Sequence, residues 1–329
     1  MTALASDTTR DSDAATGADV SVVLGIDVGG SSVKHLLARS DSSTARPPTP
    51  LARGRNATPT SSPADGLAEI VERVRGDRTL TRLVLSIPGI VDEQNGVVVR
   101  SANIPALDGT PLGRQLADAL GVPVDVINDG HAAAVAEASW GAGAGIDDVF
   151  VLALGTGIAG AHVIDGRVVS GAHGSAGELG HITIDPNGRD CSCGRRGCLE
   201  TIIGAPALHA AWADAGGKGG PEALLEAFAS GDGTPTAIVR RAASALAEAL
   251  LTLCALVDPG AIVIGGGLAQ APHHLVTLAE RYVRERATFH RVPPIVPATL
   301  GGWAGANGTV LTALLRQHAA AHRTPRTVA

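Results

Sequence analysis

Hydrophobic residues along this chain form short apolar runs that alternate with longer segments of helical spacing. Runs of strand length lie at residues 22–27, 33–38, 83–87, 122–127, 149–154, 161–164, 261–264 and 295–300. Apolar residues at helical spacing lie at 67–74, 111–120, 130–140, 206–215, 221–229, 235–257, 273–287 and 304–320. Strands and helices that alternate in this order predict an α/β fold.

One pattern occurs twice in the chain. The segments LGIDVGGSSVKHLLA at 24–38 and FVLALGTGIAGAHVI at 150–164 each read as an apolar strand, a glycine-rich polar turn and a second apolar strand. Two strands joined by a glycine turn indicate a β-hairpin. Because a repeated device suggests two similar domains that face one ligand across a cleft, we expect a two-domain protein.

The expected domain boundaries follow from the same pattern. Residues 1–20 are rich in Ser, Thr, Asp and Ala and predict a disordered tail. A small N-terminal domain is expected to comprise residues 21–127 together with 301–322. A large domain is expected to comprise residues 128–300, including a cysteine-containing loop at 178–200.

The two glycine-rich turns are candidates for phosphate binding. Successive backbone N–H groups in such a turn can hold a phosphate, and neighbouring hydroxyls add donors. The residues concerned are Gly29, Gly30, Ser31 and Ser32 in the first turn and Gly155, Thr156 and Gly157 in the second. Residues 155–160 also match G-x-G-x-x-G, but the dinucleotide fingerprint needs a following helix, and residues 161–166 indicate a strand and turn. A tight hairpin that binds nothing is the alternative for either turn alone.

Two aspartates follow strand-like runs and are candidates for chemistry. Asp27 lies just before the first glycine turn, where a carboxylate can hold a hydrated Mg²⁺ ion; a strand-end aspartate without a ligand is the alternative. Asp129 lies between a strand and a helix. It either caps the helix or serves as a general base at the carboxyl end of a strand, and the local sequence does not separate these roles.

The segment from Gly177 to Glu200 contains three of the four cysteines. Cys191, Cys193 and Cys198 have C-x-C-x4-C spacing, and His181 lies upstream. Three thiolates and one imidazole in a glycine-rich loop predict a closed, structural Zn²⁺ site of the Cys3His type, with a redox pair or coincidental spacing as the alternatives. Cys254 lies in an apolar run and is predicted to be a core residue.

Composition narrows the classes of partner. The net charge of −6 and the aromatic content of 2% argue against a nucleic-acid-binding surface, which needs basic and stacking side chains. The longest apolar run, near residues 246–257, is too short to span a bilayer, and no secretory signal is visible at the N-terminus. We therefore expect a cytoplasmic protein that binds neither nucleic acid nor membranes.

Taken together, these motifs resemble the ROK family of sugar kinases and regulators. The resemblance rests on L-G-I-D-V-G-G at 24–30, I-N-D-G-H-A-A-A at 127–134, L-G-T-G at 154–157, E-L-G-H at 178–181, C-S-C-G-R-R-G-C-L-E at 191–200 and I-G-G-G at 264–267. It covers residues 21–320 and implies an actin-like fold with two similar domains around a cleft. It also implies ATP-dependent phosphorylation of a hexose, as a glucokinase at the 6-hydroxyl, in a homodimer or higher homo-oligomer.

The resemblance also implies roles for individual residues. Asp129 is then the general base, and the sugar hydroxyls are bound by Asn128, Asp129, Glu178, His181 and Glu200. Zn²⁺ is then held by His181, Cys191, Cys193 and Cys198. ATP and Mg²⁺ are then bound by Asp27 and the two turns, with Gly265, Gly266 and Gly267 near the adenosine.

Several alternatives stay open at this point. Gly130-His131 follows Asn-Asp where glucokinases more often have Ala-Asn, so N-acetylmannosamine, N-acetylglucosamine and fructose stay open as alternatives to glucose. Polyphosphate is an alternative donor. A sugar-responsive transcriptional regulator of the same family is a further alternative, although only about twenty polar residues precede Val22, too few for a DNA-binding domain.

Overall fold

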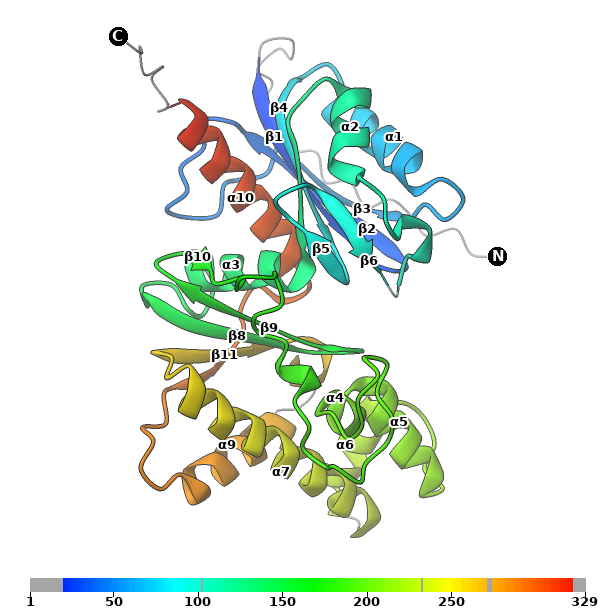
Figure 1. The fold of residues 1–329 in the computed structure, drawn as a ribbon, viewed down its shortest axis with the longest axis vertical. Helices are drawn as coiled ribbons and strands as arrows, with labels where there is room; N and C mark the ends of the chain where they lie inside the picture. Colours follow the sequence, from blue (N-terminus) through cyan, green and yellow to red (C-terminus); the bar gives the residue numbers. More distant parts are fainter. Residues whose placement is uncertain (1–19, 102, 232, 271–273, 322–329) are drawn as a thin grey trace. The chain divides into compact units, whose positions relative to one another are not determined.

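A computed structural model describes residues 20–101, 103–231, 233–270 and 274–321; all but one residue of the tail expected at 1–20 lie outside these ranges. The chain forms two compact units (Figure 1). The first comprises the residues up to Trp140 together with those from Gly302, and the second comprises Gly141–Gly301. The chain therefore passes between the units after Trp140 and after Gly301.

The first unit is built on a five-stranded sheet in the order β3-β2-β1-β4-β7. Its strands are β1 (Ser21–Val28), β2 (Ser32–Arg39), β3 (Ala52–Ala57), β4 (Thr79–Ile87) and β7 (Val124–Asn128). β2 pairs antiparallel with both β1 and β3, whereas β4 pairs in parallel with both β1 and β7. The predicted glycine hairpin is confirmed as the β1–β2 connection, in which the Gly29 N–H donates to the Ser32 carbonyl at 2.9 Å.

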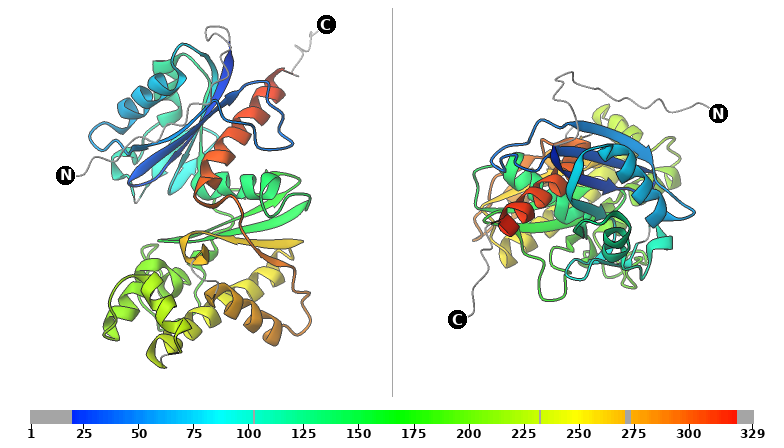
Figure 2. Two further views of the ribbon diagram at one scale, coloured as in Figure 1. Left: turned by 180° about the vertical axis from the view of Figure 1, so that it is seen from behind. Right: turned by 90° about the horizontal axis from the view of Figure 1, so that it is seen from above.

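Helices cover both faces of this sheet because its buried strands are apolar on both sides. Leu24 and Ile26 of β1 pack in one core with α1 (Pro63–Arg75) and α2 (Leu112–Leu120). The neighbouring Val23 packs in a second core with α10 (Ala304–Ala321), which lies along the sheet in Figure 2. The alternation along β1 thus assigns successive side chains to opposite faces.

Helix α3 (Asp129–Trp140) belongs to the first unit, whereas the sequence analysis placed the domain boundary after residue 127. The helix packs against α10 through small residues. A Cβ atom on Gly308 of α10 would lie 1.8 Å from the carbonyl oxygen of Ala132, so the backbones approach closely only because glycine is there. This close packing joins Asp129 to the first sheet.

A small hairpin was not predicted from the sequence. It comprises β5 (Ile90–Asp92) and β6 (Val97–Arg100), followed by a 3₁₀ turn at Pro105–Leu107. Strands of three and four residues give too short a periodic pattern to be recognised. The hairpin follows directly after β4, so it lies at the carboxyl end of that strand.

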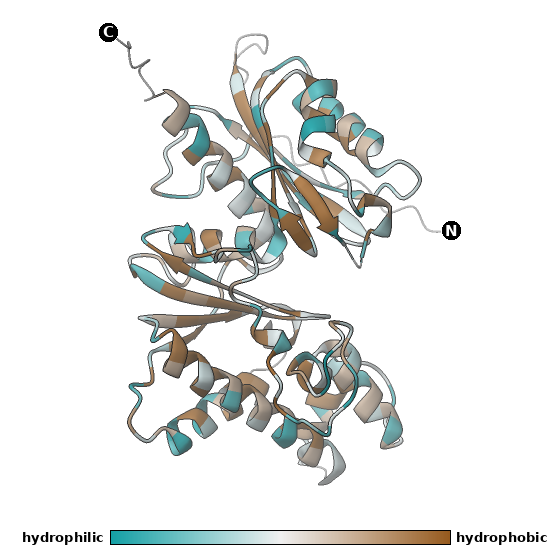
Figure 3. Ribbon diagram, viewed as in Figure 1, coloured by the Kyte–Doolittle hydropathy of each residue, from teal (hydrophilic) through white to brown (hydrophobic). Residues whose placement is uncertain are grey.

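The second unit repeats the arrangement of the first. Its sheet has the order β10-β9-β8-β11-β12, from β8 (Asp148–Leu154), β9 (Ile158–Ile164), β10 (Arg167–Val168), β11 (Ala261–Gly265) and β12 (Ile295–Pro297). Again an antiparallel hairpin precedes strands that pair in parallel. The predicted internal repeat is therefore present in three dimensions, and Figure 3 shows the strands of both sheets as mainly hydrophobic.

One large core joins this second sheet to its helices. The helices are α4 (Glu200–Ile203), α5 (Ala205–Asp214), α6 (Pro221–Ala229), α7 (Gly233–Leu256), α8 (Gly267–Gln270) and α9 (His274–Arg286). Cys254 lies within this core, as predicted. In the part of the chain that the structure describes, no helix has the length and apolar character needed to cross a membrane.

Candidate active site

Polar side chains gather at the carboxyl ends of β1, β4 and β7 in the first unit. These strands run in parallel, so their ends meet at one edge of the sheet, where α/β proteins bind ligands. Asp27 at the end of β1 accepts a hydrogen bond from the Ser86 hydroxyl of β4 at 2.9 Å. It also pairs with the Lys34 ammonium of β2 at 3.4 Å. A Cβ on Gly305 would lie 2.6 Å from the Asp27 carboxylate, so the start of α10 packs directly on this group.

Asn128, and not Asp129, caps helix α3. The Asn128 Oδ1 atom accepts a hydrogen bond from the His131 backbone N–H at 3.0 Å, which is the geometry of an N-cap residue with its third helical residue. Asp129 is the first residue of the helix, and its carboxylate accepts a hydrogen bond from the adjacent Gly130 N–H at 2.9 Å. The capping interpretation of Asp129 is therefore wrong.

The electrostatic surroundings of Asp129 differ from those of an exposed carboxylate. Burial and the negative charge of Asp27 raise the pKa of Asp129 to about 6, against the opposing effects of the Gly130 N–H and of His131. Desolvation disfavours the charged form, and a second carboxylate nearby adds repulsion. A carboxylate with a pKa near neutrality is well matched to proton transfer at physiological pH.

Glu93 and His131 are polar residues of this edge that the sequence analysis did not assign. Glu93 Oε1 lies 2.7 Å from His131 Nδ1 and accepts a second hydrogen bond, of 2.9 Å, from the Asn128 backbone N–H. The His131 side chain is almost fully buried, with 9% exposed. The only sequence signal was the unusual Gly130-His131 pair; Glu93 lies in the unpredicted hairpin and is distant in sequence.

In the second unit, the glycine turn and Glu200 come together. Glu200 Oε2 accepts a hydrogen bond from the Ile158 N–H at 3.0 Å, at the end of the Gly155–Gly157 turn. A Cβ on Gly157 would lie 3.0 Å from the same oxygen. Thr156 and Glu200 line one cavity of about 300 Å³ with Arg189, Asp190, Cys191, Ser192, Thr201, Pro206 and Ala207. A predicted sugar-binding residue thus contacts the predicted phosphate turn.

The third glycine segment, Gly265–Gly267, follows β11. Gly266 has a φ of +89°, and a Cβ there would lie 2.2 Å from the Leu154 carbonyl oxygen. Both the left-handed backbone and the close approach require glycine. Because Leu154 directly precedes Gly155, the glycines predicted near adenosine pack against the strand that carries the second phosphate turn.

The four predicted metal ligands form one cluster. The ligand atoms of His181, Cys191, Cys193 and Cys198 all lie within 4.8 Å of one another. His181 Nδ1 lies 3.5 Å from Cys191 Sγ, and the sulfurs of Cys193 and Cys198 are 3.7 Å apart. In a tetrahedral Zn²⁺ site, bonds of about 2.3 Å to sulfur and 2.0–2.1 Å to nitrogen place a nitrogen and a sulfur about 3.6 Å apart and two sulfurs about 3.8 Å apart. These residues therefore fit zinc.

The pKa values of two of these cysteines are shifted in opposite directions, and the Arg195 backbone N–H lowers the pKa of Cys193. Burial and the two neighbouring thiols raise the pKa of Cys198 to about 12. Three thiolates so close together repel one another, and a bound cation removes that repulsion. The cluster is therefore chemically suited to a thiolate-binding metal and poorly suited to three free thiolates.

The two nitrogens of His181 face different partners. Nδ1 lies on the side of the cysteine sulfurs, whereas Nε2 is 3.9 Å from Glu178 Oε2. The ring therefore joins the cysteine cluster to a carboxylate predicted to bind sugar. At 3.9 Å this pair is an electrostatic contact and not a hydrogen bond.

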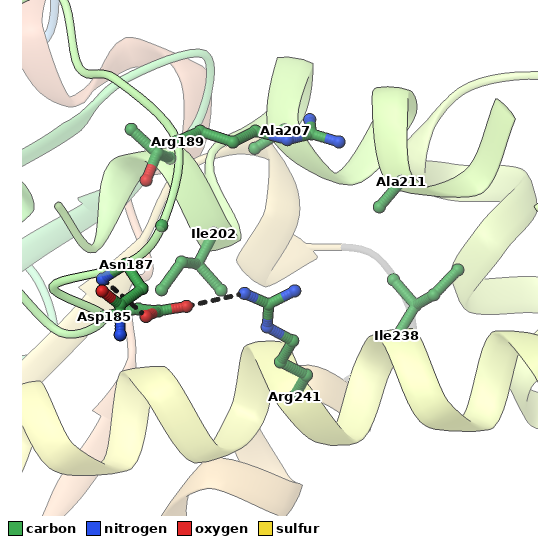
Figure 4. Close-up of a pocket in the computed structure, with 10 residues that line it drawn as sticks. Asp185, Asn187, Arg189, Ile202, Ala207, Ala211, Ile238 and Arg241 are labelled. Atoms are coloured by element: carbon green, nitrogen blue, oxygen red, sulfur yellow. Dashed lines mark hydrogen bonds and ion pairs between the residues drawn. The ribbon is translucent and has the colours of Figure 1, made fainter. Parts of the chain in front are cut away.

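Ion pairs join the cysteine loop to two helices. Arg241 of α7 pairs with Asp185 at 3.1 Å (Figure 4). Arg189 pairs with Asp214 of α5 at 3.0 Å. Asp185, Arg189 and Arg241 line a pocket of about 340 Å³ together with the apolar Ile202 and Ile238. Such exposed ion pairs each contribute little stability, so the geometry of the loop depends mainly on its own backbone and ligands.

Known proteins that are similar to this chain carry the family relationship that the motifs indicate. Residues 23–316 match the family model described as the ROK family. The chain belongs to the ROK family. It is 34% identical to the glucokinase of Thermotoga maritima over 62% of this chain and 69% of that protein. It is 29% identical to an N-acetylmannosamine kinase of Haemophilus influenzae over 69% of this chain and 76% of that protein.

Solved ROK structures share the fold. The ROK hexokinase from Thermus thermophilus is 33% identical and superposes with a TM-score of 0.78 over 91% of this chain and 99% of that chain. A ROK glucokinase from Streptomyces griseus, in complex with glucose and AMPPNP, is 28% identical with a TM-score of 0.73, over 88% and 98% of the two chains. The actin-like α/β fold and the enzyme class predicted from the sequence, an ATP-dependent sugar kinase, are confirmed.

Proposed function

We propose that this ROK protein transfers the γ-phosphoryl group of ATP to the 6-hydroxyl of glucose, with Asp129 as the general base. The observation that carries this proposal is the state of Asp129. Asn128 caps the helix, so the Asp129 carboxylate does not. The carboxylate lies near Asp27 at the carboxyl edge of the sheet, and its pKa is raised to about 6. These are the properties of a group that accepts a proton at neutral pH.

The proposed reaction is an in-line displacement. The 6-hydroxyl oxygen of the sugar attacks the γ-phosphorus, the bond to the bridging oxygen of ADP breaks, and the hydroxyl proton passes to an Asp129 oxygen. Positioning and charge stabilisation account for most of the rate of such a transfer. We assign sugar recognition to Asn128, Asp129, Glu178, His181 and Glu200.

The available groups of Asn128 and Glu200 limit how they bind a sugar. Asn128 Nδ2 donates one hydrogen to the Gly89 carbonyl at 2.8 Å, so its second hydrogen serves a sugar hydroxyl. Glu200 uses Oε2 for the Ile158 N–H, so Oε1 serves the sugar. Each residue thus fixes its own position with one atom and reads the substrate with another.

The proposed phosphate contacts come from both glycine turns. We assign Gly29–Ser32 and Gly155–Gly157 to the phosphates and Gly265–Gly267 to the adenosine side. Mg²⁺ bound with ATP supplies positive charge that neutralises the phosphates. Asp27 is the carboxylate placed to orient it, and Lys34 adds a second positive charge beside Asp27.

We assign the cysteine cluster to a zinc ion held by His181, Cys191, Cys193 and Cys198. Four protein ligands leave no open position, so such an ion supplies structure and not hydrolytic chemistry. The ligand residues then hold the loop between Glu178 and Glu200 in one conformation. Zinc therefore supports sugar recognition in this proposal.

The deciding experiment measures ADP release with glucose, mannose, fructose, N-acetylmannosamine and N-acetylglucosamine as acceptors, followed by NMR assignment of the phosphorylated carbon. We expect the highest kcat/KM with glucose and phosphate on carbon 6. Preference for N-acetylmannosamine would replace glucose by the substrate of the Haemophilus relative. Sugar binding without turnover, with either ATP or polyphosphate, would exclude the kinase proposal and favour a regulator.

A further inference from the structure

Three hydrogen bonds hold the connection between β7 and α3, which carries Asp129. Glu93 Oε1 accepts the Asn128 backbone N–H at 2.9 Å, and Asn128 Nδ2 donates to the Gly89 carbonyl at 2.8 Å. The Asn128 Oδ1 atom then accepts the His131 N–H at 3.0 Å. Gly89 and Glu93 belong to the segment at the end of β4, more than thirty residues away in sequence. The long-range contacts therefore fix Asn128 from the hairpin side.

Glu93 also fixes the first turn of α3 through a side chain. Its Oε1 lies 2.7 Å from His131 Nδ1. An ionised carboxylate can only accept, so Nδ1 carries the hydrogen and the tautomer of His131 is set. The same carboxylate oxygen therefore contacts the residue before Asp129 and the second residue after it.

The arrangement is suited to orient Asp129. One oxygen of Glu93 contacts both sides of the turn that carries Asp129, and the donating side chain of His131 is only 9% exposed. Removing the carboxylate leaves the Asn128 N–H and the His131 ring without this acceptor, and the turn becomes free to shift. A displacement of about 1 Å in a reacting group costs about a hundredfold in rate.

We propose that Glu93 and His131 form a positioning pair that holds Asp129 in its catalytic orientation. The pair acts on the chemical step through Asp129 and does not itself touch the sugar or ATP. This inference rests on the proposed role of Asp129 as general base. It assigns a function to the Gly130-His131 sequence, which differs from the Ala-Asn that is more frequent in glucokinases.

The test compares Glu93→Ala, Glu93→Gln, His131→Ala and the double variant Glu93→Ala/His131→Ala. Glutamine keeps an oxygen that accepts both hydrogen bonds, whereas alanine removes it. We expect Glu93→Ala to lower kcat by about 10- to 100-fold with the sugar KM changed less than about threefold, and glutamine to restore kcat to within about fivefold of the wild type. The double variant should lose no more than Glu93→Ala alone, because the His131 side chain acts through its contact with Glu93.

Asp92→Ala is the matched control. Asp92 is the neighbouring carboxylate, and it hydrogen-bonds Asn95 within its own hairpin. Its removal should leave kcat within about twofold. All rates are measured well below the melting temperature of each variant, so that unfolded protein does not lower the measured kcat.

A second readout does not depend on activity. The nitrogen shifts of the His131 ring report its tautomer by NMR, and Glu93→Ala should change them while Asp92→Ala leaves them unchanged. Unchanged kcat in an active Glu93→Ala protein, or a loss confined to the sugar KM, would overturn the inference. An inactive wild-type protein would instead remove the proposed function, and the His131 shifts then show whether the contact exists.

Discussion

Replacing Asp129 by asparagine separates catalysis from stability in this protein. Asparagine has the same shape and still accepts the Gly130 N–H through its oxygen, so the change removes charge and basicity alone. The structure predicts opposite effects on the two properties. Turnover should fall by about 10²- to 10⁴-fold, the usual contribution of a general base, while the fold becomes more stable at neutral pH.

The size of the stability gain follows from the pKa. Folding raises the pKa of Asp129 from the ordinary 3.8 to about 6, a change of about 2 units. At 1.36 kcal/mol per unit this corresponds to at most about 3 kcal/mol, and screening of the partly buried side chain reduces it, so we expect about 1–3 kcal/mol. The ionised carboxylate destabilises the folded state, and asparagine removes that cost.

Because folding raises the pKa of Asp129, the stability of the wild type depends on pH in one direction. Below pH 3.8 the carboxyl is protonated in both folded and unfolded chains and contributes no difference. Between pH 3.8 and about 6 only the unfolded chain loses the proton, so the wild type loses stability as the pH rises. The gain of Asp129→Asn should therefore be complete at pH 8 and shrink toward pH 4.

Urea unfolding followed by circular dichroism at pH 8 and pH 4.5 measures this difference. Asp125→Asn is the matched control, a carboxylate on the preceding strand β7 that is paired with Arg82 at 2.6 Å and with Arg316. Removing that charge breaks favourable ion pairs and should destabilise the protein at pH 8. An Asp129→Asn protein no more stable than wild type at pH 8, or one with full activity, would refute the assignment.

Three further predictions concern pH, glycine and zinc. For the wild type, kcat/KM should fall tenfold per pH unit below about pH 6, where Asp129 becomes protonated; a profile flat from pH 5 to 8 would contradict this. Gly266→Ala should lower the free energy of unfolding in urea by about 2 kcal/mol or more, because φ is +89° and the Leu154 carbonyl leaves no space for a Cβ atom. Gly267→Ala is the control: its Cβ would meet nothing within 4 Å, so the free energy of unfolding should change by less than about 0.5 kcal/mol. Elemental analysis should find about one zinc per chain, lost in Cys198→Ser and kept in Cys254→Ala, and zinc removal should raise the sugar KM before the protein melts. Fully active protein without zinc, or melting with no earlier rise in KM, would count against that role.

The sequence determined the elements whose signal is local. Short apolar runs, glycine turns and helical periodicity specified four of the five strands in each sheet and the repeated hairpin, because period and turn chemistry are properties of neighbouring residues. The edge strands β3 and β10 were not among them. Ligand spacing specified the cysteine cluster for the same reason. Short elements such as β5, β6 and α4 gave too little periodic signal to predict.

The domain boundary and the role of Asn128 depended on distant contacts. Helix α3 joins the first unit because Gly308 admits the Ala132 backbone, a contact between residues far apart in the chain. An Asn-Asp pair before a helix offers two possible caps, and geometry alone selected Asn128. Because Asn128 is the cap, the Asp129 carboxylate does not cap the helix.

The sequence by itself therefore determined the family, the fold and the kinds of ligand, since each depends on residue types at fixed spacing. Tertiary structure decided the surroundings of Asp129, His131 and the cysteine cluster. It placed Asp27 and Asp129 close enough to raise a pKa, brought Glu93 to His131, and turned His181 so that Nδ1 faces sulfur and Nε2 faces Glu178. These properties arise from distances between groups remote in sequence, which spacing along the chain does not encode.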